Sequence, residues 1–259
     1  MYIDAHAHLD KYGDDELARV LETIESHEIL TFSVSVDVGS FLRTEAIAAR
    51  SPLIVPAFGI QPEDAPESVD SFEEIEDLVE RSPFIGEIGL DHRFVTDEAA
   101  YGPQREVFSR FLTLAREQDK LVNVHTAGAE QDTADMLHSH RIERAIIHWY
   151  SGPLDVLQQL VAGGFMFTVG PEVLHSDHIR EVARAIPAHQ LLTETDNPGG
   201  LRWLTGDPGY PSLLLDVVDE LALVRGVDRD DLVATVHFNM TRLLAGDEHL
   251  ASWIDVVRP

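Results

Sequence analysis

The sequence predicts an α/β fold of the closed (β/α)8 barrel, or TIM barrel, type. Eight short apolar runs of strand length recur along the chain, separated by longer amphipathic stretches of helical period. The runs are apolar on both faces, as expected of parallel strands that are buried on both sides. The length of 259 residues also suits such a barrel, which typically needs about 250.

The elements follow one another in regular alternation. The expected strands lie near residues 2–6, 30–36, 54–59, 84–88, 121–125, 145–148, 165–169 and 191–195. The expected helices lie near residues 15–27, 72–80, 104–118, 133–140, 154–162, 178–185, 212–224 and 229–244. Asp228 is a good N-cap for the last of these, and Asp230 and Asp231 suit the positive end of its dipole. An open doubly wound sheet is the alternative, but it needs a Gly-rich turn after the first strand, and AHAHLDKYG is not one.

Composition limits the possible classes of protein. With 44% hydrophobic residues and no Pro/Ser-rich linker or internal repeat, we expect one domain over residues 1–259. The chain has no cysteine, which excludes a disulfide framework and thiolate ligands. The first strand starts at the N-terminus and no apolar run approaches about 20 residues, so we expect no signal peptide, no membrane span and a cytoplasmic location. No obligate protein partner is evident.

The charge is strongly negative. Acidic residues number 46 against 19 basic ones, for a net charge of −27, and Lys11 and Lys120 are the only lysines. Molar salt shortens the Debye length to about 3 Å and relieves the self-repulsion of such a chain. We therefore expect a protein from a high-salt cytoplasm, a halophile, with an ordinary acidic enzyme as the alternative.

Six side chains that can bind metal ions stand at the ends of the expected strands. They are His6, His8, Glu87, His125, His148 and Asp196. Parallel strands of a barrel carry their active site at their carboxyl-terminal ends, so side chains nearly 200 residues apart should meet there. A single strand-end histidine is usually structural, but six such groups on five strand ends indicate a metal site.

The ligand types suggest two divalent ions. Histidines at positions i and i+2 of a strand, as in His6 and His8, project to the same side and can hold one ion together. Six ligands exceed the four that one zinc ion normally takes, and Glu87 is the natural bridge between two ions. Imidazole and carboxylate without sulfur suit zinc, although manganese or magnesium could also support activity.

The motifs that carry these residues resemble those of the TatD family of metal-dependent hydrolases, within the amidohydrolase-like barrels. They are IDAHAHLD, GEIGLD, Gln104 with REVFSRFLTLAREQ, the His125 strand, IIHWYSG, LLTETDNP and FNMTRLL, almost from end to end of the chain. The resemblance implies a (β/α)8 barrel with two ions and hydrolysis of phosphodiester bonds, usually as a nuclease.

The resemblance also implies a division of the ligands between the ions. His6, His8, Glu87 and Asp196 would hold one ion, and Glu87, His125 and His148 the other. Many related barrels bridge their ions with a carbamylated lysine, but no lysine stands at a strand end here. The bridge therefore falls to Glu87, which favours the TatD type over dihydroorotase-like or phosphotriesterase-like enzymes.

Several residues near the ligands depart from the family pattern. Gln61 occupies the histidine position of a Gly-x-His-Pro segment, and Trp149 stands where a small residue is frequent. His125 is followed by Thr126 and Ala127 instead of the frequent His-x-Arg, so an expected phosphate-binding arginine is missing. These positions surround the metal ligands and bear on the choice of substrate.

Two kinds of reaction follow from these residues. The first is a phosphodiesterase or deoxyribonuclease acting on nucleic acid ends, in which two metals activate a water and Asp196 is the general base. Arg93 and Arg202 are candidate phosphate contacts, and Trp203 and Tyr210, in the loop expected after Asp196, could stack on a base.

The second kind of reaction is hydrolysis of a small amide, ester or lactone by the same ions. A non-catalytic binding barrel is the least favoured alternative, because no metal ligand is lost.

Overall fold

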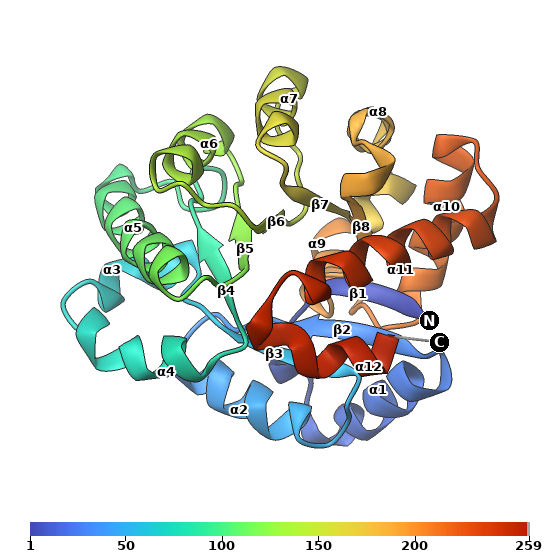
Figure 1. Cartoon of the computed structure of the whole chain (residues 1–259), viewed down its shortest axis with the longest axis horizontal. Helices are drawn as coiled ribbons and strands as arrows, with labels where there is room; N and C mark the ends of the chain where they lie inside the picture. The colour runs from blue at the N-terminus through green and yellow to red at the C-terminus, as the bar shows by residue number, and fades with distance from the viewer. Residues whose placement is uncertain (258–259) are drawn as a thin grey trace.

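Eight parallel strands follow one another round the molecule in their order along the sequence (Figure 1). The computed structural model describes residues 1–257; residues 258–259 of the expected single domain lie outside the described residues. The strands are β1 (Tyr2–Ala7), β2 (Ile29–Ser33), β3 (Ile54–Phe58), β4 (Phe84–Gly89), β5 (Val122–His125), β6 (Ala145–Ile147), β7 (Met166–Val169) and β8 (Leu191–Thr193). The predicted (β/α)8 barrel is confirmed.

Helices surround the strands, and α11 crosses one end of the barrel near β1 and β8 (Figure 1). The helices are α1 (Asp14–Ser26), α2 (Val38–Ala48), α3 (Ala65–Ser68), α4 (Glu76–Arg81), α5 (Tyr101–Glu117), α6 (Glu130–Ser139), α7 (Leu154–Ala162), α8 (Asp177–Ala185), α9 (Gly199–Thr205), α10 (Leu213–Arg225), α11 (Arg229–Ala245) and α12 (Ile254–Val257). Short 3₁₀ segments occupy several of the connections. No helix among residues 1–257 has the length and apolar character that crossing a membrane requires.

Four helices were absent from the sequence prediction, namely α2, α9 and the one-turn helices α3 and α12. The chain forms α2 because the Asp37 side chain accepts a hydrogen bond from the backbone N–H of Ser40 and so caps the helix. The apolar residues before it had suggested a strand continuing to Val36, but β2 ends at Ser33. The segment predicted as a loop after Asp196 forms α9, which starts directly after Pro198 in spite of its two leading glycines.

The barrel is nearly closed by contacts between β8 and β1. The backbone N–H of Asp196 donates to the carbonyl of His6 at 2.9 Å, and that of His8 donates to the carbonyl of Asn197 at 2.8 Å. Deeper in the barrel, the buried Asp4 carboxylate accepts hydrogen bonds from both the backbone N–H and the hydroxyl of Thr195. These bonds fix the two strand ends that carry His6, His8 and Asp196.

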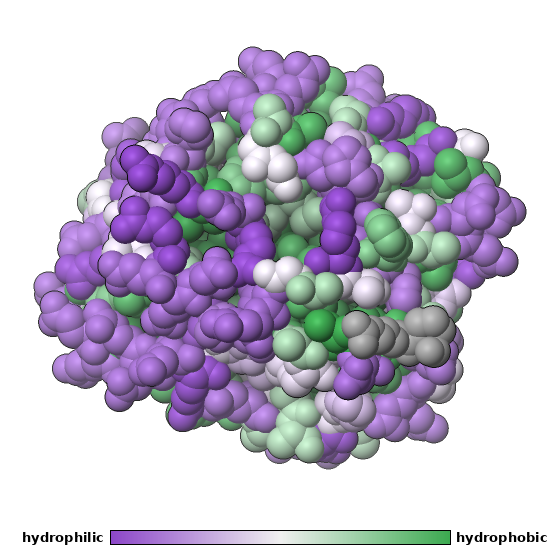
Figure 2. Space-filling view, in the orientation of Figure 1, coloured by the Kyte–Doolittle hydropathy of each residue, from purple (hydrophilic) through white to green (hydrophobic). Residues whose placement is uncertain are grey.

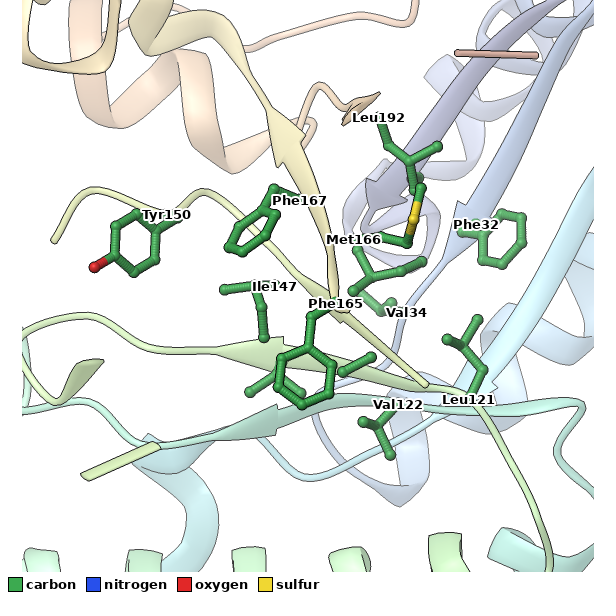
Figure 3. Close-up of a cluster of buried hydrophobic side chains, with 14 of the residues drawn as sticks. Phe32, Val34, Leu121, Val122, Ile147, Tyr150, Phe165, Met166, Phe167 and Leu192 are labelled. Atoms are coloured by element: carbon green, nitrogen blue, oxygen red, sulfur yellow. The ribbon is translucent and has the colours of Figure 1, made fainter. Parts of the chain in front are cut away.

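The hydrophobic core fills the space between the strands and the helices. It also fills the part of the barrel away from the carboxyl-terminal ends of the strands. Figure 3 shows part of it, where side chains from different strands, among them Phe32, Val122, Ile147, Met166 and Leu192, gather between the ribbons. Near the strand ends, buried polar side chains take over. His6 of β1 contacts Asn123 of β5 at 2.9 Å, and these strands lie on opposite sides of the barrel, so the contact passes through its interior.

Hydrophilic side chains cover most of the face shown in Figure 2. Because the net charge is −27, we predict that raising potassium chloride from low to molar concentration raises the melting temperature. The rise should be roughly 2–4 °C for each kcal/mol of repulsion removed. Thermal melts measure this, and an unchanged melting temperature would contradict the role given to the charge. An origin in a high-salt cytoplasm stays a prediction.

A charge-reduced variant provides the control for this experiment. Glu73, Glu74, Glu76 and Asp77 are exposed and lie close together at α4 and the turn before it. Their replacement by glutamine and asparagine removes four negative charges without changing the core. The melting temperature of this variant should respond less to potassium chloride than that of the wild type.

Candidate metal centre

The structure brings all six expected ligands together at the carboxyl-terminal ends of the strands. They are His6 in β1, His8 directly after β1, Glu87 in β4, His125 at the end of β5, His148 directly after β6 and Asp196 after β8. Four of them are buried, and the side chains of His125 and Asp196 are 18% and 22% exposed. The strand ends of a parallel barrel are thus what positions these groups.

Four ligand atoms form the first donor set. His6 Nε2 and His8 Nε2 lie 3.3 Å apart, and Glu87 Oε2 lies 3.7 and 3.3 Å from them respectively. Asp196 Oδ1 lies 3.6 Å from the His6 nitrogen and 3.3 Å from the His8 nitrogen. Metal bonds of about 2.0–2.2 Å in a tetrahedron place ligand atoms about 3.3–3.6 Å apart. The five separations that involve a histidine nitrogen therefore suit ligands of one ion, and His6, His8 and Glu87 form a compact group with Asp196 beside it.

Three ligand atoms form the second donor set, on the other side of Glu87. Its Oε1 lies 2.8 Å from His125 Nδ1 and 3.1 Å from His148 Nε2, and the two histidine nitrogens are 3.0 Å apart. The two oxygens of one carboxylate thus face different donor sets. This arrangement fits a binuclear site in which Glu87 is shared.

The imidazoles are held with the correct nitrogen toward the site. The amide of Asn123 donates to the carbonyl of Ala5, so its oxygen faces His6 Nδ1, which must donate. His125 Nε2 donates to Asp91 Oδ2 at 2.8 Å. In His6 the other nitrogen keeps its lone pair for a metal ion, and in His125 the other nitrogen faces the site and can bind an ion once its proton is displaced.

The sequence reasoning missed these orienting residues. His148 Nδ1 lies 3.5 Å from Glu194 Oε2, which makes Glu194 a third residue of this kind after Asn123 and Asp91. The strand period of two offered a signal for two of them, since Asn123 precedes His125 by two residues and Glu194 precedes Asp196 by two. Asp91, in contrast, follows β4 in a loop whose course the sequence pattern does not predict.

Backbone conformation also shapes the site. Asp196 has a φ of +48°, in the left-handed region that few residues other than glycine, asparagine and aspartate adopt readily. Its N–H is bound by the His6 carbonyl, and its carbonyl accepts from Gly200 at 2.7 Å. Gly89 has a φ of +148°, and a Cβ there would overlap the carbonyl oxygen of His125. Glycine thereby lets β4 and β5 approach each other beside the ligands.

The protonation states of the histidines differ. Burial, together with the neighbouring His148, lowers the pKa of His6 to about 3, so His6 is neutral and ready to bind a cation. Burial opposes protonation of His125 as well, but its hydrogen bonds with Asp91 and Glu87 outweigh this and raise its pKa to about 9. The pKa of Glu87 is held well below its usual range, because His148 and His125 outweigh the effect of burial.

We predict from these states that metal binding releases protons. Below pH 9 the metal-free protein carries a proton on His125 that an ion must displace, so affinity should rise with pH toward 9, by up to tenfold per pH unit for each proton released. Calorimetric titration with zinc in two buffers of different ionisation enthalpy gives the proton count. Affinity independent of pH between 6 and 9, with no proton release, would contradict this.

A cavity of about 470 Å³ opens over the ligands. Of the candidate substrate contacts, Arg93 and Trp203 line it. Arg202 does not line it and is exposed on α9 instead, so the structure gives it no place beside the ligands. Gln61 and Ala127, which depart from the expected motifs, are both in the lining.

Several known proteins are similar to this chain in sequence or fold. A model of the family described as TatD related DNase matches residues 3–245. An uncharacterized metal-dependent hydrolase from Methanocaldococcus jannaschii is 25% identical to this chain. The alignment covers 92% of this chain and 94% of the relative. The deoxyribonuclease TATDN3 from Homo sapiens is 25% identical over 96% of each chain. The crystal structure of YJJV, a TatD homolog from Escherichia coli K12, superposes on this chain with a TM-score of 0.83 and 23% identity. The superposition covers 93% of this chain and 97% of the YJJV chain.

Proposed function

The chain belongs to the family of TatD-related DNases, and on that premise we propose that it hydrolyses phosphodiester bonds at the ends of nucleic acids. The observation that carries the proposal is the sharing of Glu87 between two donor sets at the floor of a cavity. Paired ions some 3.5–4 Å apart are a recurrent device for in-line displacement at phosphorus. The human relative is a deoxyribonuclease by name, which supports the proposal.

The residues have distinct parts in this reaction. Two divalent ions, when bound, lower the pKa of a water and stabilise the charge that develops on the phosphoryl oxygens. His6, His8 and Asp196 would hold one ion, His125 and His148 the other, and Glu87 both. Nitrogen and carboxylate donors without sulfur suit zinc, with manganese or magnesium as alternatives.

Asp196 is the proposed general base. Its Oδ1 faces His6 and His8, and the side chain also lines the cavity. Burial would raise its pKa, but the hydrogen bond with His8 and the charge interactions with His8, His6 and His148 together outweigh this and lower it, so the carboxylate is ionised. It can therefore take a proton from a water in the cavity, which the imidazoles cannot do while their lone pairs bind metal.

The overall charge limits how nucleic acid can bind. A protein with a net charge of −27 lacks the broad basic surface on which non-specific DNA binding depends. The cavity itself offers two cationic side chains, Lys11 and Arg93. Binding would therefore rely on the metal ions and on a few short-range contacts, which persist in molar salt.

Hydrolysis of a small amide, ester or lactone is the second candidate function. It is favoured by the cavity wall after β5, where Thr126 and Ala127 provide no cation for a phosphate. It would use the same ions and the same base. The two candidates thus differ in the substrate and not in the metal centre.

One screen separates the candidates. The purified protein is incubated in molar potassium chloride with zinc, manganese or magnesium and with single-stranded DNA, RNA, and small amide, ester and lactone substrates in parallel. We expect metal-dependent shortening of the oligonucleotides and its loss with a chelator. Turnover of the small substrates alone would replace the proposed function by the second candidate.

A further inference from the structure

One tryptophan side chain, Trp149, connects the segments that follow three consecutive strands. Strands β6, β7 and β8 lie side by side in the barrel (Figure 1). Trp149 comes directly after His148 at the end of β6, and its indole reaches both the 3₁₀ segment Pro171–Leu174 after β7 and the start of α9 after β8. It therefore lies between the candidate ligand His148 and the helix that follows Asp196.

The backbone of Trp149 is held in an unfavourable conformation. Its φ is +41°, in the left-handed region that bulky residues rarely adopt. Its N–H is fixed there by hydrogen bonds to Glu194 Oε1 at 2.9 Å and to the Thr168 hydroxyl at 3.0 Å. Such a conformation persists only where the surroundings enforce it, and it is found most often at functional sites. The turn after His148 is thus set by these contacts and not by local preference.

The segment after β7 holds one edge of the indole. The indole N–H donates to Glu172 Oε2 at 2.6 Å, a short hydrogen bond to a carboxylate. A Cβ at Gly170 would lie 3.4 Å from the Trp149 ring and 3.0 Å from the Glu194 side chain. Glycine at this position therefore leaves room for both side chains.

The start of α9 lies against the six-membered part of the indole. A Cβ at Gly200, in the first turn of α9, would lie 2.6 Å from a ring atom of Trp149. The N–H of Gly200 donates to the carbonyl of Asp196 at 2.7 Å, and Trp203 further along α9 makes an edge-to-face contact with Trp149, with centroids 6.2 Å apart. The ring thus supports α9 at the point where the helix is bonded to Asp196.

We propose that Trp149 is a positioning residue that holds the start of α9 and, through it, the carboxylate of Asp196. This inference rests on the proposed function, because it takes Asp196 as the general base. Asp196 lies in a left-handed turn of its own, with a φ of +48°, so the direction of its side chain depends on what the following helix packs against. A displacement of about 1 Å in a reacting group can cost about 100-fold in rate.

Hydrogen exchange tests the positioning without any substrate. Exchange of the backbone amides of residues 196–205 is followed by mass spectrometry in the zinc-loaded wild type and in Trp149→Ala. Loss of an aromatic contact and a hydrogen bond should speed exchange in this segment roughly 5- to 100-fold. Exchange in β1–β5 should stay at the wild-type rate. Equal exchange of residues 196–205 in the two proteins would overturn the proposal.

Trp253→Ala is the matched control for the loss of a large side chain. Trp253 is half-buried in the 3₁₀ segment Glu248–Trp253, which packs on α11. Its replacement should leave the exchange of residues 196–205 unchanged. An equal acceleration in Trp253→Ala would mean that the effect of Trp149→Ala is a general loss of stability, and it would overturn the assignment to Trp149.

A pair of variants at Glu172 keeps the indole in place. Glu172→Ala removes the acceptor of the indole N–H, whereas Glu172→Gln keeps an oxygen that can accept it. We expect Glu172→Ala to speed exchange of residues 196–205 less than Trp149→Ala does, and Glu172→Gln to behave like the wild type. This pair decides the matter if Trp149→Ala does not fold. Equal exchange in the two Glu172 variants would then overturn the proposal.

The rate of turnover tests whether the effect reaches the base. At saturating zinc, Trp149→Ala should lower kcat by about 10- to 100-fold and change KM less. In the Asp196→Asn background the same change should lower kcat by less than about twofold, because two residues that act through one group are not additive. An equal loss of kcat in both backgrounds would show that Trp149 acts independently of Asp196.

The outcomes also separate this inference from the proposed function. If the wild type turns over none of the substrates in the screen, the proposed function has failed. The exchange comparison still decides whether Trp149 holds Asp196 and α9 in place, because it needs no substrate. If the wild type is active and Trp149→Ala matches it in kcat, the positioning role is overturned while phosphodiester hydrolysis stands.

Discussion

Replacing Glu87 by glutamine is expected to remove most of the bound metal and most of the activity together. The two oxygens of Glu87 face different donor sets, Oε2 toward His6 and His8 and Oε1 toward His125 and His148. Glutamine keeps the shape, but it presents one carbonyl oxygen and one amide that cannot bind a cation, and it removes the negative charge. Even outer-shell changes typically cost 10–100-fold in metal affinity, so loss of this ligand should cost more than about 100-fold.

Metal content by elemental analysis after gel filtration, together with activity on the best substrate found, measures this effect. Glu63→Gln is a matched control, because Glu63 lines the same cavity and is exposed, away from both donor sets. We expect that control to keep its metal. A Glu87→Gln protein that retained two ions per chain at wild-type affinity would show that Glu87 is not the bridge.

Replacing Asp196 by asparagine should slow turnover by at least about 100-fold while much of the metal remains bound. General acid–base catalysis contributes typically 10²–10⁴-fold, and the variant removes the base but keeps an oxygen ligand. The backbone supports this choice of substitution, because Asp196 has a φ of +48° and asparagine tolerates the left-handed region as well as aspartate does. Loss of rate would therefore not arise from a strained backbone.

Rate and metal content are measured side by side for this variant. Asp207→Asn, a change at an exposed aspartate just beyond α9, is the control and should behave like the wild type. Near-full activity of Asp196→Asn would mean that the proposed base is wrong and that the ions act without it.

The barrel could be predicted because its signals are local. Each strand is a short apolar run, and each candidate ligand stands at or just beyond the end of one, so chain order alone places them at one mouth. The helix α9 was missed because its two glycines and the nearby prolines resemble a loop, and because the chain turns at Asp196, in a left-handed conformation, shortly before the helix begins. Local propensity carries no signal for that.

The environment of the ligands could not be predicted in the same way. The bond from His125 to Asp91 and the contact between Phe94 and Trp203 each join the loop after β4 to another element, so they depend on the course of that loop. Arg202 and Trp203 illustrate the limit. They are neighbours in sequence, yet Trp203 lines the cavity and Arg202 does not, because successive residues of a helix point in different directions.

The central claim is that one carboxylate, Glu87, joins two ions at the mouth of this barrel. Crystals grown with zinc and measured above and below the zinc absorption edge test it most directly. We predict two anomalous peaks about 3.5–4 Å apart, one among His6, His8 and Asp196 and the other beside His125 and His148, with Glu87 between them. A single peak, or a pair that Glu87 does not contact, would contradict the account.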